Sequence, residues 1–130
     1  MKPPVWVLHD LVISVQEQLL AAFGGASGVR DVGLLESALA RPENRLAYER
    51  TAVSHFDLAA AYAFGLAKNH PFIDGNKRIA FATAVVLLEL NGYRFEADEA
   101  NAVIQTLALA AGELKEDEYA HWLKTNSKRT

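Results

Sequence analysis

The sequence predicts an all-α fold, a helical bundle, from its hydrophobic pattern, its length and its composition. Apolar residues recur with a period near 3.6 along almost the whole chain, and few segments alternate with a period of two. A chain of 130 residues that is 51% hydrophobic and 22% charged is typical of a folded globular protein with a sizeable core. We therefore expect a single α-helical domain that spans residues 1–130.

The elements in the first half are predicted from prolines and glycines. A helix opened by Pro3 and Pro4 should run to Ala22, just before a pair of glycines. After a glycine-rich loop comes a short helix, which we expect Pro42 to stop. The next segment, 43–54, is the least regular of the chain and partly alternates, so we interpret it as an extended, flap-like insertion.

Four further helices are predicted in the second half. They cover about 54–70, 76–91 and 98–111, and the last carries Tyr119, Trp122 and Leu123. The helix at 76–91 is apolar nearly all round after its first turn, so we expect it to be the central buried helix. The final residues, 127–130, are expected to fray.

Charge and composition argue against several classes of protein. The formal net charge of -3 does not favour electrostatic binding of nucleic acid by the molecule as a whole. The absence of cysteine excludes disulfides and thiolate metal sites, and it fits a reducing cytoplasm. The start lacks the pattern of a signal peptide, and the longest apolar run, 79–90, is too short for a bilayer. We expect a cytoplasmic protein without a membrane or nucleic-acid partner.

The segment 70–81, HPFIDGNKRIAF, combines polar side chains with the start of the apolar helix. If that helix begins at Gly75 or Asn76, its first N–H groups have no internal partner and form an anion site. Gly75 permits a sharp turn and a close approach to a ligand, and Asn76 can bond locally or reach a phosphate. Lys77 and Arg78 lie where the helix dipole disfavours cations. The pattern therefore predicts a bound phosphate.

Asp74 and His70 each allow two interpretations. Just before a helix, a carboxylate such as Asp74 is most often an N-cap, but beside bound phosphates it would be an oxygen ligand for Mg²⁺. At the end of a helix, a histidine such as His70 is usually a cap or a packed side chain, but beside a phosphate it is a candidate general base. A zinc site, a P-loop and a serine nucleophile elbow all lack their required residues.

Two stretches resemble a known family. Residues 70–78, HPFIDGNKR, resemble the Fic/Doc signature HxFx(D/E)GN(G/K)R. Residues 28–39, GVRDVGLLESAL, resemble the GxRDxGLLESAL segment of the death-on-curing (Doc) branch. The resemblance covers most of the chain, from about His9 through the last helix. It implies a helical fold in which the helix after the signature loop is central, with ATP and Mg²⁺ bound at its N-terminus.

The resemblance also implies roles for individual residues. His70 would take the proton from a hydroxyl of the target protein, and Asp74 would bind Mg²⁺. Gly75 and Asn76 would form the anion cradle. The segment 43–54 would be the flap that aligns the target peptide.

Lys77 and Arg78 would contact the nucleotide phosphates, and Arg78 would share in catalysis. Fic adenylyltransferases carry glycine at the position of Lys77 and a second arginine at the position of Phe81. A lysine obstructs the phosphate pose that glycine admits, so the resemblance implies that ATP binds in the reverse sense and presents its γ-phosphate. Gly75, by contrast, is the residue that Fic adenylyltransferases carry at this position. The alternatives to a kinase are a Fic-type adenylyltransferase and a non-catalytic nucleotide-binding module.

The Doc branch implies a toxin of a toxin–antitoxin system. Its expected target is a translation protein, the elongation factor EF-Tu, modified on Ser or Thr so that translation and growth stop. The family's self-inhibitory motif (S/T)xxxE(G/N) is absent from the sequence. The resemblance therefore implies a separate, Phd-like antitoxin, whose disordered tail folds into a groove of the toxin.

Overall fold

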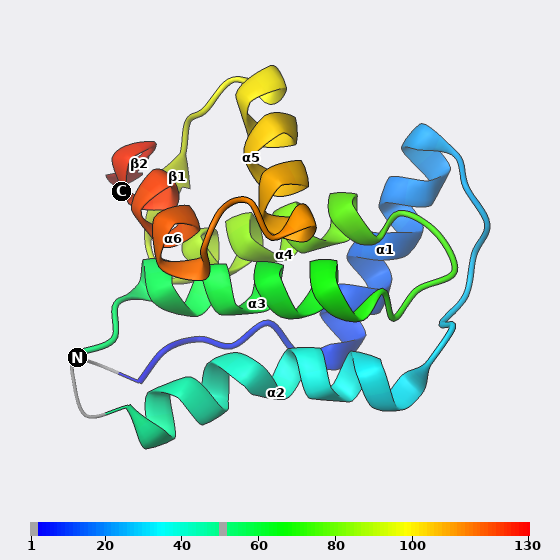
Figure 1. Ribbon diagram of the computed structural model, residues 1–130, viewed down its shortest axis with the longest axis horizontal. Coiled ribbons are helices and arrows are strands. Elements are labelled where there is room, and N and C mark those ends of the chain that lie inside the picture. Colours follow the sequence, from blue (N-terminus) through cyan, green and yellow to red (C-terminus); the bar gives the residue numbers. More distant parts are fainter. Residues whose placement is uncertain (1–2, 50–51) are drawn as a thin grey trace.

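The computed structural model describes residues 3–49 and 52–130 of the chain. The regular structure of this part consists of helices and one small sheet (Figure 1). The helices are α1 (His9–Phe23), α2 (Val32–Tyr48), α3 (His55–Asn69), α4 (Asn76–Leu90), α5 (Glu99–Ala111) and α6 (Glu116–Thr125), and the strands are β1 (Tyr93–Phe95) and β2 (Ser127–Arg129). The predicted all-α class is confirmed. Within the described parts, no helix combines the length and apolarity needed to cross a bilayer.

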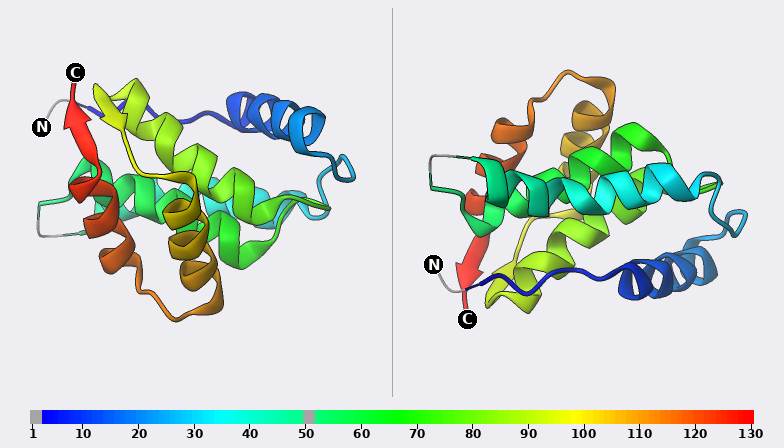
Figure 2. Two further views of the ribbon diagram at one scale, coloured as in Figure 1. Left: turned by 90° about the horizontal axis from the view of Figure 1, so that it is seen from above. Right: turned by 90° about the horizontal axis from the view of Figure 1, so that it is seen from below.

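Helix α3 is the most completely buried element. Its small residues let neighbouring helices approach closely, and a Cβ atom at Gly65 would lie 3.1 Å from the Cα atom of Ala38 in α2. Helix α4 packs against α1, α3, α5 and β1, which makes it central as predicted. Figure 2 shows α1 on one side of α4 and α5 on the other. The loop between α3 and α4 lies at one end of this stack.

The predicted start of the first helix was wrong by about six residues. Residues 3–8 form no helix, because side chains of α3 and of the C-cap of α4 satisfy backbone groups of this segment. Asn91 exchanges two hydrogen bonds with the backbone of Val5, at 2.8 and 2.9 Å. The hydroxyl of Tyr62 accepts from the N–H of Val7 at 3.2 Å and donates to its carbonyl oxygen at 3.4 Å. Tertiary contacts therefore replace the helix that the proline pair suggested.

Helix α2 does not stop at Pro42. It continues through this buried proline to Tyr48, so the predicted extended flap over 43–54 is wrong for its first six residues. Residues 50–51 lie outside the described residues, and residues 49 and 52–54 of the predicted flap belong to no helix or strand. The helix persists because Arg45, one turn beyond the proline, forms ion pairs with Glu116 and Asp57.

The C-terminal residues form a strand, so the prediction that they fray was also wrong. Strand β2 pairs antiparallel with β1, with Arg94 opposite Lys128. A further hydrogen bond at each end extends the pairing: Glu96 N–H to the carbonyl of Asn126 at 2.7 Å, and Thr130 N–H to that of Gly92 at 2.9 Å. No periodicity in so short a segment could have predicted this partner.

Candidate functional site

Residues 70–75 of the signature form the loop that connects α3 to α4 (Figure 1), and residues 76–78 form the first turn of α4. His70 is the C-cap residue of α3 and is exposed, and its backbone is left-handed with φ 48° and ψ 54°. Phe72 is buried and anchors the loop in the core. Asn76 begins α4. The fold thus brings the end of one helix, with its histidine, next to the start of another.

Asp74 is not the N-cap of α4. The cap position belongs to Gly75, whose φ of 73° suits glycine, and no side chain caps the helix among the described residues. The Asp74 carboxylate instead accepts hydrogen bonds from the N–H groups of Gly75, at 2.8 Å, and Ala26, at 3.3 Å. The first N–H groups of α4 therefore remain available to an anion, which favours the functional interpretation over the capping one.

Asn76 uses its side chain locally. Its Oδ1 atom accepts from the N–H of Phe72 at 2.9 Å, and its Nδ2 atom donates to the Phe72 carbonyl at 3.0 Å. These two bonds close the loop and hold its curvature. The side chain of Asn76 thus shapes the cradle, while its contribution to phosphate binding stays a prediction.

Lys77 and Arg78 are exposed in the first turn of α4. The Arg78 guanidinium lies 4.6 Å from the ring centroid of Phe23, at the end of α1, a cation–π contact that holds it near the helix N-terminus. Cations are unfavourable at this end of a helix unless an anion is present. This arrangement is the electrostatic part of the candidate phosphate site.

Gln16 in α1 supports the loop, and the sequence did not reveal it. Its side chain is 1% exposed, and its Nε2 atom donates to the backbone carbonyl of Asp74 at 2.7 Å. A Cβ atom at position 75 would lie 3.4 Å from that same Nε2 atom, so Gly75 also permits this close packing. The available signal was a polar residue on the buried face of α1, between Val12 and Leu20.

A second loop element contacts the signature from the side of α2. The backbone N–H groups of Arg30 and Asp31 donate to the carbonyl of Pro71 at 2.7 and 3.1 Å. The Arg30 side chain reaches the end of α3, and Asp31 is the N-cap of α2, accepting from the N–H of Leu34 at 2.9 Å. The RD pair of the upstream segment therefore joins the signature loop to α2.

An apolar groove of about 740 Å³ begins beside Lys77 and Arg78 and runs between α1, α4 and α5. The residues that give it its apolar character include Leu19, Phe23, Phe81, Val85, Val103 and Leu107. Several of them are largely exposed: 60% for Phe23, 53% for Val103 and 47% for Leu107. Such a contiguous apolar surface is typical of a binding site for another chain.

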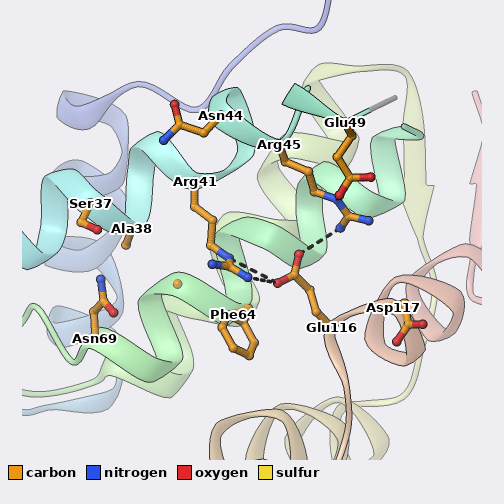
Figure 3. Close-up of a pocket in the computed structure, with 11 residues that line it drawn as sticks. Ser37, Ala38, Arg41, Asn44, Arg45, Glu49, Phe64, Asn69, Glu116 and Asp117 are labelled. Atoms are coloured by element: carbon orange, nitrogen blue, oxygen red, sulfur yellow. Dashed lines mark hydrogen bonds and ion pairs between the residues drawn. The ribbon is translucent and has the colours of Figure 1, made fainter. Parts of the chain in front are cut away.

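A separate, polar cavity of about 660 Å³ lies between α2, α3 and the start of α6 (Figure 3). Glu116 occupies it and bridges two arginines of α2, with its Oε2 atom 2.9 Å from Arg45 and its Oε1 atom paired with Arg41. The Arg41 guanidinium also lies 4.5 Å from the ring centroid of Phe64. The Glu116 carboxylate and the two guanidinium groups neutralise one another, so we interpret this cavity as a structural junction between α2 and α6.

Metal ligands are sparse around the loop. Within residues 3–49 and 52–130, no three His, Cys, Asp or Glu side chains converge as a metal cage would require. A single carboxylate combined with substrate phosphates is, however, a usual way to hold Mg²⁺. Asp74, exposed next to the start of α4, fits that mode of binding.

Comparison with known proteins agrees with this geometry. A model of the Fic/DOC family matches residues 6–88. The chain is 47% identical over 81 residues to "Toxin Doc" of Mycolicibacterium smegmatis, an alignment that covers 59% of this chain and 59% of that protein's length. It is 31% identical over 114 residues to "Protein kinase doc" of Escherichia phage P1, covering 87% of this chain and 88% of that protein. With the signature loop placed at the N-terminus of a central helix, these matches show that the chain belongs to the Fic/DOC family.

Proposed function

We propose that the protein is a Doc-like toxin that transfers the γ-phosphate of ATP to a Ser or Thr hydroxyl of a cytoplasmic protein, with EF-Tu as the expected target. The observation that carries the proposal is the N-terminus of α4, which bears two cations, has no side-chain cap from residues 3–49 or 52–130, and adjoins His70. The names of the two relatives, a Doc toxin and a Doc protein kinase, agree with it.

The proposed reaction is an in-line phosphoryl transfer. The target hydroxyl oxygen attacks the γ-phosphorus, and the bond from that phosphorus to the β,γ-bridging oxygen breaks, so that ADP leaves. His70 takes the hydroxyl proton. The N–H groups at the start of α4, with Lys77 and Arg78, stabilise the negative charge on the transferring group. Such a reaction depends mainly on positioning and charge neutralisation, which these residues supply.

Asp74 would hold Mg²⁺ together with the phosphates. When bound, the ion neutralises phosphate charge and orients the nucleotide. The hydrogen bonds from Gly75 and Ala26 orient the Asp74 carboxylate at the start of α4. Gln16 holds the backbone of Asp74 from below.

The experiment that tests the proposal is incubation of the purified protein with EF-Tu, Mg²⁺ and ATP labelled at either the α- or the γ-phosphate. We expect label on EF-Tu from γ-labelled ATP alone. Transfer from the α position alone would show adenylyl transfer and would replace the proposed reaction. The control is His70→Ala, which should abolish both labelling and growth inhibition; unchanged growth inhibition by this variant would exclude catalysis as its cause.

The proposed partner is an antitoxin, Phd-like in having a disordered tail, which would bind in the apolar groove between α1, α4 and α5. An amphipathic helix suits an apolar groove, because one of its faces can replace the water that now contacts Val103 and Leu107. Val103→Glu should weaken binding of the proposed antitoxin by at least about tenfold, since a charge is then buried in the interface. Leu90→Glu, on an exposed apolar residue outside the groove, is the matched control. Equal affinity of both variants would place the partner elsewhere.

A further inference from the structure

The backbone of His70 is unusual. Among the described residues it is the only non-glycine residue with a positive φ, at 48°. This left-handed conformation is unfavourable for a residue with a Cβ atom, and the following Pro71 restricts the backbone of residue 70 further. A residue stays in such a conformation only when its surroundings hold it there. His70 therefore needs an external restraint.

Arg30 supplies that restraint. Its Nε atom donates to the carbonyl oxygen of His70 at 2.8 Å, and its Nη2 atom donates to that of Asn69 at 2.9 Å. The backbone N–H of the same residue donates to the carbonyl of Pro71 at 2.7 Å. Three successive carbonyls around His70 are thus held by one residue. The planar fork of a guanidinium is what allows two of them to be bound at once.

Simple helix capping does not require this fork. A cation near the C-terminus of a helix is favourable by charge alone, and a lysine provides that charge as well as an arginine. The fork does more, because it fixes the peptide planes on both sides of the His70 Cα atom. Those planes fix the direction of the Cα–Cβ bond from which the imidazole extends. Capping and positioning therefore differ in what Arg30→Lys should do.

We propose that Arg30 is a positioning residue, which holds His70 in its left-handed conformation and so directs the imidazole toward the anion site at the start of α4. This inference rests on the proposed function, in which His70 accepts the hydroxyl proton. It also explains the arginine of the GVRD segment, whose side chain and backbone donate hydrogen bonds to the backbone around His70.

The kinetic test compares Arg30→Lys and Arg30→Gln with the wild type in γ-phosphate transfer to EF-Tu. Both variants should lower kcat by at least about tenfold, because small displacements of a catalytic group cost that much, while the Kd for ATP changes less than about twofold. Arg94→Gln, on an exposed arginine of β1, is the matched control and should leave both values unchanged. The proposal is overturned if Arg30→Lys keeps wild-type kcat, or if the loss appears only in ATP affinity.

An independent readout is the ¹H–¹⁵N spectrum of the histidine side chains, which needs neither ATP nor target. In Arg30→Lys the His70 signals should shift and broaden, while those of His9, His55 and His121 stay in place. Unchanged His70 signals, or equal changes in all four histidines, overturn the proposal. If the wild type transfers no phosphate, the proposed function fails, and this spectrum still decides whether Arg30 positions His70. Should Arg30→Gln not fold, Arg30→Lys, which keeps the charge, decides alone.

Discussion

In the proposed function, Lys77 is the residue expected to favour phosphoryl over adenylyl transfer. It is exposed in the first turn of α4, beside Arg78 and at one end of the apolar groove. A lysine at this point adds positive charge to the phosphate site and fills space that a glycine would leave open.

Replacing Lys77 by glycine should lower the rate of γ-phosphate transfer by about tenfold to a hundredfold. This factor corresponds to the free energy of one hydrogen bond to a charged group. Lys77→Arg, which keeps the charge, should lose less. Initial rates with γ-labelled ATP measure the loss, and rates with α-labelled ATP show whether adenylyl transfer appears. A wild-type γ rate in Lys77→Gly would contradict the assigned role of this lysine.

His55 is a second residue with a testable property. Burial, with a smaller contribution from the charge of Arg129, lowers the pKa of His55 below its ordinary value of 6.5. The unfolded chain therefore binds more protons than the folded one in this range, so stability should fall as pH falls through 6.5.

The measurement is the free energy of unfolding in urea at about pH 7.5 and about pH 5.5. Wild type should lose more stability over this interval than His55→Gln does. His121→Gln, on an exposed histidine, is the control and should behave as wild type. The same pH dependence in all three proteins would show that His55 does not contribute.

At the level of elements, capping residues explain where helices begin. Ser54 and Asp57 form a reciprocal capping box at the start of α3, and Asp98 caps α5. Helix α4 starts differently, with Gly75 at its N-cap and two cations in its first turn. Since a stable start normally needs a partner for its N–H groups, this difference agrees with a ligand as the missing partner.

Ser54→Ala should destabilise the protein by about 1 kcal/mol, the usual cost of losing an N-cap side chain. Its effect on phosphate transfer should be small, because Ser54 lies at the end of α3 opposite His70. Thermal and urea unfolding give the stability change. Ser14→Ala, on the exposed face of α1, is the matched control and should be close to neutral. If Ser54→Ala lost more phosphate-transfer activity than folded protein, this would contradict the expectation that the start of α3 does not affect the site around His70.

For the whole molecule, the junction around Glu116 links the last helix to α2. The side chains of Glu116 and Arg45 are 16% and 20% exposed, so their ion pair is partly buried (Figure 3). Partly buried pairs in a network contribute more than isolated surface pairs, because removal of one partner leaves the others desolvated and unpaired.

Glu116→Ala should therefore lower the free energy of unfolding by about 1 to 2 kcal/mol, between the values for surface and buried pairs. The difference from wild type should shrink at high salt, which screens the exposed part of the network. Urea titrations at low and high salt measure both effects. Glu36→Ala, on an exposed glutamate of α2, should be neutral at either salt concentration. Equal stability of the two variants would show that the junction is not a stabilising one.

The helices predicted by periodicity and capping largely match the structure, because both signals are local. Helices α3, α4 and α5 lie within a residue or two of their predicted bounds. The errors share a different origin. Pro42 did not end α2, residues 3–8 are not helical, and residues 127–129 form a strand. In each case side chains or a strand distant in sequence supply the partners.

The sequence alone established the helical class and the composition of the signature loop, since the residues of a nine-residue motif need no tertiary contact to be recognised. Only the fold revealed that Gly75 caps α4 while Asp74 does not, that Asn76 closes the loop, and that Gln16 and Arg30 hold its two ends. The physical reason is sequence separation. Gln16 lies 58 residues before Asp74, and Arg30 lies 40 residues before His70, so no local sequence pattern encodes these contacts.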